Sequence, residues 1–331
     1  MVTRHAPEPL PPGWDTEARP LKMVRGRTYS HYMFDEASSA AQKAIRRGYP
    51  IEAVQWLLEM FWSGPDAPRT NAWNRCLVMC VEDIGPADPQ LLPAIWNMSE
   101  SHRHDPLAMA SAAAYLAEAK KCRINDWKTM LVPALKDSAV ADATIDSAGG
   151  TSGAAYRLSS ALISKEEGAC HYWVMALVFT TYKVRGRYSN AQSLIWSTFK
   201  EVLPGPYTAM ACQFGLSNNW RWQDKTRLVM SHLINLWCND RYPTTVKWEL
   251  PLRQELSEYV KGFKMRDPQL VVGIPDYALD KHTGRGRSLK RDMTHFFEVG
   301  AVLNNREPEW AAYDEWCRRH VAGLRGLKLA D

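Results

Sequence analysis

Apolar residues recur along most of this chain at the three- and four-residue spacing of an amphipathic helix, and no other sequence feature limits the fold as strongly. Between Ala37 and Ile45 the apolar positions share one helical face, and Gly48 then interrupts the pattern. Pro50 stands where a helix favours its first residue. No run shows the alternating pattern of a half-buried strand. The sequence therefore predicts an all-α fold of stacked helical hairpins.

Breaks in this pattern predict three segments. Residues 1–28 are rich in Pro and have little periodicity, so we expect a flexible N-terminal arm; it lacks the apolar stretch of a secretory signal. The run DSAGGTSG at 146–153 is the clearest interruption of the chain. We expect a first helical region at 29–145 and a second at 154–331.

Local signals predict where several helices lie. Asp105 followed by Pro106 is typical of an N-cap and the first residue of a helix. Ser164 and Glu167 have the spacing of a capping box, which predicts a helix start after Ser164. A short helix is expected at 127–135.

The composition is that of an ordinary globular protein, with 46% hydrophobic and 23% charged residues. No run approaches 18 apolar residues, so no membrane association is expected. The seven cysteines are odd in number, contain no C-x-x-C and lie mostly in apolar runs. They predict reduced thiols and an intracellular, cytoplasmic or nuclear location rather than disulfides or a zinc site.

The motifs of common enzyme classes are absent from the sequence. The glycine cluster at 149–153 lacks the lysine of a phosphate-binding loop, and there is no G-x-S-x-G, H-E-x-x-H or EF-hand pattern. We therefore expect no ATP hydrolysis, no cofactor and no metal, and binding rather than catalysis.

The clearest indication of a binding site is the run KHTGRGRSLKR at 281–291, which holds five Lys or Arg and no acid. Gly284 and Gly286 would let the backbone approach a ligand, and arginine binds phosphate bidentately. A solvated basic loop is the alternative interpretation. The residues expected to contact phosphates of nucleic acid, with DNA favoured, are Lys281, His282, Arg285, Arg287, Lys290 and Arg291.

Further basic residues follow two predicted helices and would extend this track. Their alternative role is to offset a helix dipole at its C-terminal end. These residues are Lys43, Arg46, Arg47, Arg185 and Arg187.

Acidic residues occupy the last turn of another predicted helix, where the dipole disfavours them. Glu82 and Asp83 therefore require compensation, either by a buried arginine, for which Arg69 and Arg75 are nearby candidates, or by capping of the next helix.

A second acidic group suggests a different function. Asp276, Asp280, His282 and His295 contain the residue types of metal or acid–base sites, although their spacing matches no metal pattern. A metal-dependent enzyme that acts on nucleic acid through Asp276, Asp280 and His282 is thus one alternative.

Three stretches resemble a known family in the same order: FDEASSAAQKAIRRGYPIEAVQWLLEM at 34–60, NRCLVMCVEDIGPADPQLLPAI at 74–95 and PLAMASAAAYLAEAKKC at 106–122. They are similar to the helical collar that follows the ATPase module in AAA+ proteins of the replication-associated recombination protein A type, which are related to clamp loaders. Glu82, Asp83, Gly85 and Asp88 belong to the most specific part. The ATPase module itself is absent from this chain. The chain also resembles uncharacterised proteins of large DNA viruses that have a DKHT-type loop.

The resemblance implies a collar-like fold, subunit contacts and work at replication forks. Together with the basic loop, it favours a non-catalytic nucleic-acid-binding protein of DNA replication, repair or genome maintenance. A homo-oligomer or a replication protein is the expected partner. The other alternative is a protein-interaction or oligomeric scaffold protein whose basic loop binds an acidic partner.

Overall fold

The fold is all-α, as the periodicity predicts. The computed structural model describes residues 3–5, 26–64, 66–180, 189–216, 222–265 and 272–329. Within these ranges the chain forms sixteen α-helices and a single sheet of two short strands.

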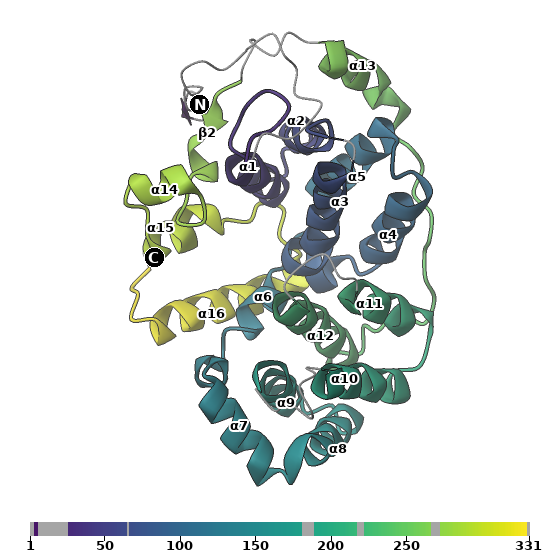
Figure 1. Cartoon of the computed structure of the whole chain (residues 1–331), viewed down its shortest axis with the longest axis vertical. Coiled ribbons are helices and arrows are strands. Elements are labelled where there is room, and N and C mark those ends of the chain that lie inside the picture. Colours follow the sequence, from purple (N-terminus) through teal and green to yellow (C-terminus); the bar gives the residue numbers. More distant parts are fainter. Residues whose placement is uncertain are drawn as a thin grey trace.

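Five helices form one layer, which lies in the upper half of Figure 1. These are α1 (Phe34–Arg47), α2 (Pro50–Phe61), α3 (Ala67–Met79), α4 (Leu91–Ser101) and α5 (Pro106–Glu118). Helix α1 ends as predicted, because Gly48 adopts a left-handed conformation with φ 70° and its N–H bonds back into the last turn. Helix α5 begins as predicted, with the Asp105 side chain accepting a hydrogen bond from the N–H of Leu107.

A second group of helices lies in the lower half of the same view. They are α7 (Ser138–Ser147), α8 (Gly150–Ile163), α9 (Glu167–Phe179), α10 (Ser189–Val202), α11 (Pro206–Leu216) and α12 (Trp222–Cys238). Helix α9 packs between α7, α8 and α12. The main hydrophobic core runs without interruption from the upper layer into this group.

The remaining elements lie between or beside these two groups (Figure 1). Helices α6 (Ile124–Lys128) and α16 (Pro308–Leu324) pack against each other at the centre, over a smaller core that includes Trp127 and Phe297. Helices α14 (Gly284–Ser288) and α15 (Met293–His295) lie beside α1, whereas α13 (Ser257–Met265) caps the upper layer.

The N-terminal residues that the structure describes are paired with a distant segment. Strand β1 (Arg4–His5) runs antiparallel to β2 (Ile274–Pro275), and the carbonyl of Thr3 accepts a hydrogen bond from Asp276. This short sheet was not predicted, because two residues are too few to show an alternating pattern. The rest of the predicted arm at 1–28, apart from 26–28, lies outside the described residues.

Tryptophan and cysteine residues mostly fill the interior. Trp56, Trp73 and Trp127 are buried, and each is among the largest enclosed side chains. The seven cysteines are free thiols, and all except the half-buried Cys238 are buried. No helix in the described ranges is both long and apolar enough to cross a membrane.

Three local predictions differ from the structure. The predicted break at 146–153 is only a short turn, since α8 already begins at Gly150. Ser164 forms no capping box: it ends α8, and its hydroxyl donates to the carbonyl of Ser160. The predicted helix at 127–135 is also shorter, because α6 ends at Lys128.

Candidate functional site

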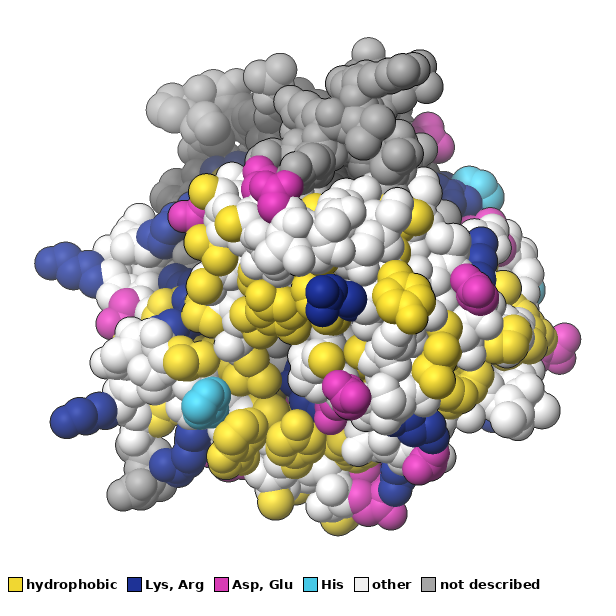
Figure 2. All heavy atoms as spheres, turned by 90° about the horizontal axis from the view of Figure 1, so that it is seen from below, with side chains coloured by type: hydrophobic (Ala, Val, Ile, Leu, Met, Phe, Trp, Pro, Cys, Tyr) yellow, Lys and Arg dark blue, Asp and Glu magenta, His cyan; other side chains and the backbone are white. Residues whose placement is uncertain are grey.

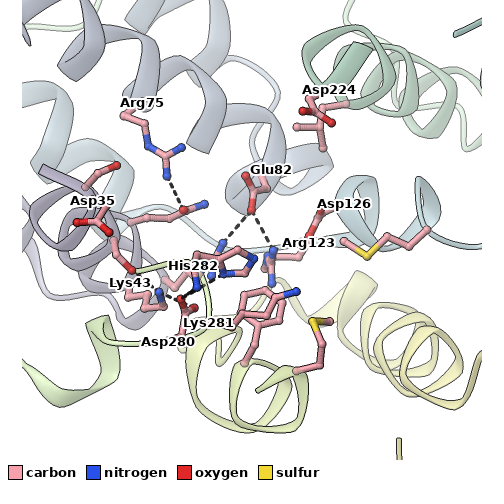
Figure 3. A pocket seen from close by; sticks show the side chains of 18 of the residues that line it. Asp35, Lys43, Arg75, Glu82, Arg123, Asp126, Asp224, Asp280, Lys281 and His282 are labelled. Carbon is pink, nitrogen blue, oxygen red and sulfur yellow. Dashed lines mark hydrogen bonds and ion pairs between the residues drawn. The ribbon is translucent and has the colours of Figure 1, made fainter. Parts of the chain in front are cut away.

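A cavity of about 410 Å³ brings together the motifs that stand far apart in the sequence. Lys43 and Arg46 come from α1, Glu82 from the turn after α3, and Asp280, Lys281 and His282 from the basic loop. Figure 3 shows these elements around one common space, with Arg75 and Arg123 on its walls. The first and last of these motifs are more than 230 residues apart, so only the fold reveals that they share a site.

A buried network of charges forms the inner wall of the cavity. The carboxylate of Asp83 is fully buried and accepts from Arg46 Nε at 2.7 Å, while Arg123 Nε lies 3.1 Å away in an ion pair. Arg46 and Arg123 also reach Glu82 Oε1, at 2.8 and 3.0 Å. Arg123 additionally bonds to Asp126. Each buried charge therefore has an opposite partner, as buried ions require.

The predicted partners of Glu82 and Asp83 were only partly right. Arg69 bonds to His104 instead, and Arg75 reaches the acids indirectly. Arg75 Nη2 donates to Gln42 Oε1 at 2.7 Å, and Gln42 Nε2 donates to Asp83 at 2.9 Å. The main partners, Arg46 and Arg123, lie about 40 residues away on either side, outside the neighbouring sequence.

Glycine is required at the turn that carries the acidic pair. Gly85 has φ 54° and ψ −136°, and an added Cβ would lie 2.6 Å from the carbonyl oxygen of Cys122. Asp88 follows on the same turn, half-buried, and its carbonyl accepts a hydrogen bond from Leu91 at the start of α4. Within this motif, Glu82 lines the cavity and Asp83 is buried beside it, whereas Gly85 and Asp88 shape the turn that leads to α4.

The outer wall contains a buried lysine–aspartate pair with a histidine beside it. Lys43 Nζ lies 2.8 Å from Asp280 Oδ2, and His282 bonds to Asp280 Oδ1 through its backbone N–H at 2.8 Å and its ring Nδ1 at 3.2 Å. Burial lowers the pKa of Lys43 to about 8, against the opposing effect of Asp280. Although burial raises the pKa of Asp280, the contacts with His282 and Lys43 prevail and lower it.

The basic loop folds back on itself after Asp280. Thr283 caps α14, since its hydroxyl accepts a hydrogen bond from the N–H of Gly286. A Cβ on Gly286 would lie 1.9 Å from the carbonyl oxygen of Asp280. The missing side chain of Gly286 thus allows the backbone of Asp280 to approach closely, and not a ligand as predicted. Gly284 has no such restriction, because a Cβ there would meet only Asp35 Oδ2, at 3.8 Å.

Several of the predicted phosphate ligands are engaged in internal contacts. Arg285 forms a bidentate ion pair with Glu36 at 2.7 and 2.8 Å. Arg291 pairs with Asp276 and donates to the carbonyl of Leu279. Arg47 lies over the ring of Tyr277 and donates to Val299. Lys43 and Arg46 are buried within the ion pairs described above.

Four exposed or partly exposed cations remain, and we call them the basic rim: Lys281, Arg287, Lys290 and Arg325. Within the described ranges, none of them lies within ion-pair distance of a carboxylate. Arg287 donates to the carbonyl of Lys281, and Arg325, like Lys281, lines the cavity. Burial lowers the pKa of Lys281, and the charge of Arg325 lowers it further. The sequence analysis missed Arg325, which no motif marks. Arg185 and Arg187 lie outside the described residues.

The aspartates of the alternative catalytic prediction are in two separate clusters. Asp276 lies 2.6 Å from His5 Nε2 and pairs with Arg291, while Asp280 pairs with Lys43 and His282. His295 is partly buried, and burial lowers its pKa. Across the ranges that the structure describes, no group of three His, Cys, Asp or Glu residues is arranged to hold a metal ion.

Comparison of the chain with models of protein families, with curated proteins and with solved structures found no match.

The charge network predicts loss of stability in acid. Burial raises the pKa of Glu82, but Arg46 and Arg123 outweigh it and lower that pKa from 4.5 to about 2. The stabilisation is therefore present above pH 4.5 and is lost as the pH falls toward 2. This difference corresponds to about 3 kcal/mol. Urea unfolding between pH 6 and 3 should show this decline, and Glu82→Gln should flatten it. An equally steep decline in that variant would exclude Glu82 as a source.

Proposed function

We propose that this protein binds nucleic acid, with DNA favoured, through the basic rim, and that it acts without catalysis in DNA replication, repair or genome maintenance. The observation that carries this proposal is the position of the rim. Its cations lack carboxylate partners within the described residues. Lys281 and Arg325 line the cavity where the sequence motifs converge, and Arg287 and Lys290 stand on the same loop as Lys281. Clustered cations without internal partners favour a polyanionic ligand.

The rim also has the chemistry of a phosphate contact. Arg287 and Lys290 are exposed. The guanidinium of Arg287 donates a hydrogen bond to the backbone carbonyl of Lys281, which ties these two residues of the loop together. The resemblance to clamp-loader-related collars adds the expected setting at replication forks. The internal ion pairs of Arg285 and Arg291 support this role indirectly, because they fix the loop on which the rim residues stand.

Removing two rim charges should weaken binding without unfolding the protein. In Arg287→Gln/Lys290→Gln we expect roughly tenfold weaker binding to labelled DNA, on all sequences alike. The slope of log affinity against log salt concentration should become shallower by about two. Stability should change by less than about 0.5 kcal/mol, because both side chains are exposed.

The matched control removes two exposed cations from the lower helices, Arg157 on α8 and Lys200 on α10. Arg157→Gln/Lys200→Gln changes the net charge equally but should leave the affinity within about twofold of the wild type. Equal loss in both double variants would show that net charge, and not the rim, determines binding.

A second candidate function is protein–protein interaction. Seen from below, the lower face carries apolar side chains interspersed with charges of both signs (Figure 2). Among the described residues, Tyr156 and Ile163 are the most exposed large apolar ones, at 75% and 69%, and both belong to α8, which lies in the lower half of Figure 1. Exposed apolar side chains of this kind favour a contact surface. A molecular mass that rises with concentration, without nucleic-acid binding, would favour this function over the first.

A further inference from the structure

We propose that the cavity lined by Lys281 and Arg325 of the basic rim binds a phosphomonoester, either the terminal phosphate of a nucleic-acid strand or the phosphate of a free nucleotide. For the terminal phosphate of a strand, this inference rests on the proposed function. For a free nucleotide, it is independent of that function. It assigns a ligand to the cavity itself, in addition to the one proposed for the rim.

The first support is the set of unused donors on the cavity wall. Arg75 donates one hydrogen bond, to the neutral Gln42, and its buried Nε has no partner. The side chain of Arg123 is almost fully enclosed, and its Nη1 is likewise buried without a hydrogen-bond partner. Buried donors without acceptors are costly, and few occur in native proteins. An anion with several oxygens is the ligand that would satisfy such donors.

The second support is the balance of charges on the walls. The cavity is lined by seven Lys or Arg side chains and five Asp or Glu side chains. The carboxylates are already occupied: Glu82 and Asp126 by arginines, Asp280 by Lys43, Asp224 by Arg227, and Asp35 by the N–H of Gly284.

The cations are not all matched in this way. Arg75, Lys281 and Arg325 line the same space with no carboxylate at ion-pair distance within the described residues. The lining therefore has an excess of positive charge that is available to a ligand. Burial lowers the pKa of Arg75, which is the direction expected for a guanidinium that lacks a close counter-charge.

The third support is the shape of the cavity. Its volume of about 410 Å³ is in the range of small-molecule sites, and residues of α1, α3, α6, α12 and the segment 280–282 line it. An internal phosphodiester continues in both directions and needs an open groove, whereas a terminal phosphate enters a recess end-on. His282 lines the cavity and its side chain is about half exposed. With Lys281 and Arg325, it would contact the part of the ligand that extends from the bound phosphate toward solvent.

The test compares labelled single-stranded DNA that carries a 5′-phosphate, a 3′-phosphate or only hydroxyl ends, together with adenosine monophosphate and inorganic phosphate as competitors. For the wild type we expect roughly tenfold preference for a phosphorylated end, and competition by adenosine monophosphate. In Arg75→Gln, which keeps an amide beside Gln42, this preference should fall to about onefold. Thermal unfolding of Arg75→Gln checks that the fold persists.

Lys290→Gln is the matched control, because it removes an exposed rim charge outside the cavity lining. It should weaken all strands equally and leave the end preference intact. Equal binding of phosphorylated and hydroxyl ends, with no competition by adenosine monophosphate, would overturn the inference and leave the proposed function standing.

The two sources of phosphate give different results. If no nucleic acid binds but adenosine monophosphate binds and Arg75→Gln abolishes its binding, the cavity serves a free nucleotide and the proposed function is wrong. If neither class of ligand binds, both proposals fail. A preference that persists in Arg75→Gln would also contradict the assignment to this cavity.

Discussion

Replacement of Asp83 by alanine should destabilise the protein by about 3–5 kcal/mol, because it removes the fully buried one of the two carboxylates that Arg46 and Arg123 share. Asp83 is fully buried and contacts Arg46, Arg123 and Gln42 within 3.1 Å. Its side chain thus connects α1, the turn after α3 and the segment before α6. Urea unfolding followed by tryptophan fluorescence measures the loss.

The control for this substitution is an acid of the same charge in an exposed ion pair. Glu258 on α13 pairs with Lys261, and both side chains are largely exposed. Glu258→Ala should change stability by less than about 0.5 kcal/mol. A loss within about 1 kcal/mol for Asp83→Ala would show that the network does not hold the cavity wall together.

Replacement of Gly286 by alanine should displace the basic loop and remove most nucleic-acid binding. The added Cβ would lie 1.9 Å from the carbonyl oxygen of Asp280 and 2.7 Å from the backbone nitrogen of the same residue. Backbone atoms cannot move aside as the end of a flexible side chain can. Overpacking of this kind lowers the free energy of unfolding by about 1–3 kcal/mol. Because Asp280 holds Lys43 and His282, its displacement should also alter the cavity.

Gly284→Ala is the matched control, two residues away on the same short helix. The nearest atom to its Cβ would be Asp35 Oδ2 at 3.8 Å, an ordinary contact. We expect stability within about 0.5 kcal/mol of the wild type and unchanged DNA affinity. Similar results for the two alanine variants, by unfolding and by binding, would contradict the close packing at Gly286.

The sequence predicts those helices whose apolar residues are periodic and whose ends have strong signals. Helices α1, α2 and α5 fulfil both conditions, with Gly48, Pro50 and Asp105 at their ends. Helices α7 and α8 were missed, because small and polar residues fill 138–160 and only a few positions, such as Ile145 and Leu158, are buried. Tertiary packing overrides weak propensity there.

The candidate site was predictable in its parts but not in its assembly. The acidic pair Glu82–Asp83 indicated a need for buried cations, which the structure supplies. Their identity depends on which helices pack together, so Arg46 and Arg123 replaced the local candidates. Likewise, Arg285 belongs to a strongly basic run, but only the packing of α14 on α1 places Glu36 opposite it.

The proposal of nucleic-acid binding is tested most directly by the affinity of the wild-type protein for labelled single- and double-stranded DNA and RNA at several salt concentrations. The rim predicts binding that weakens steeply with salt, because contacts with phosphates release counterions. Absence of binding to every strand at the lowest salt concentration would contradict the proposal and leave protein–protein interaction as the favoured function.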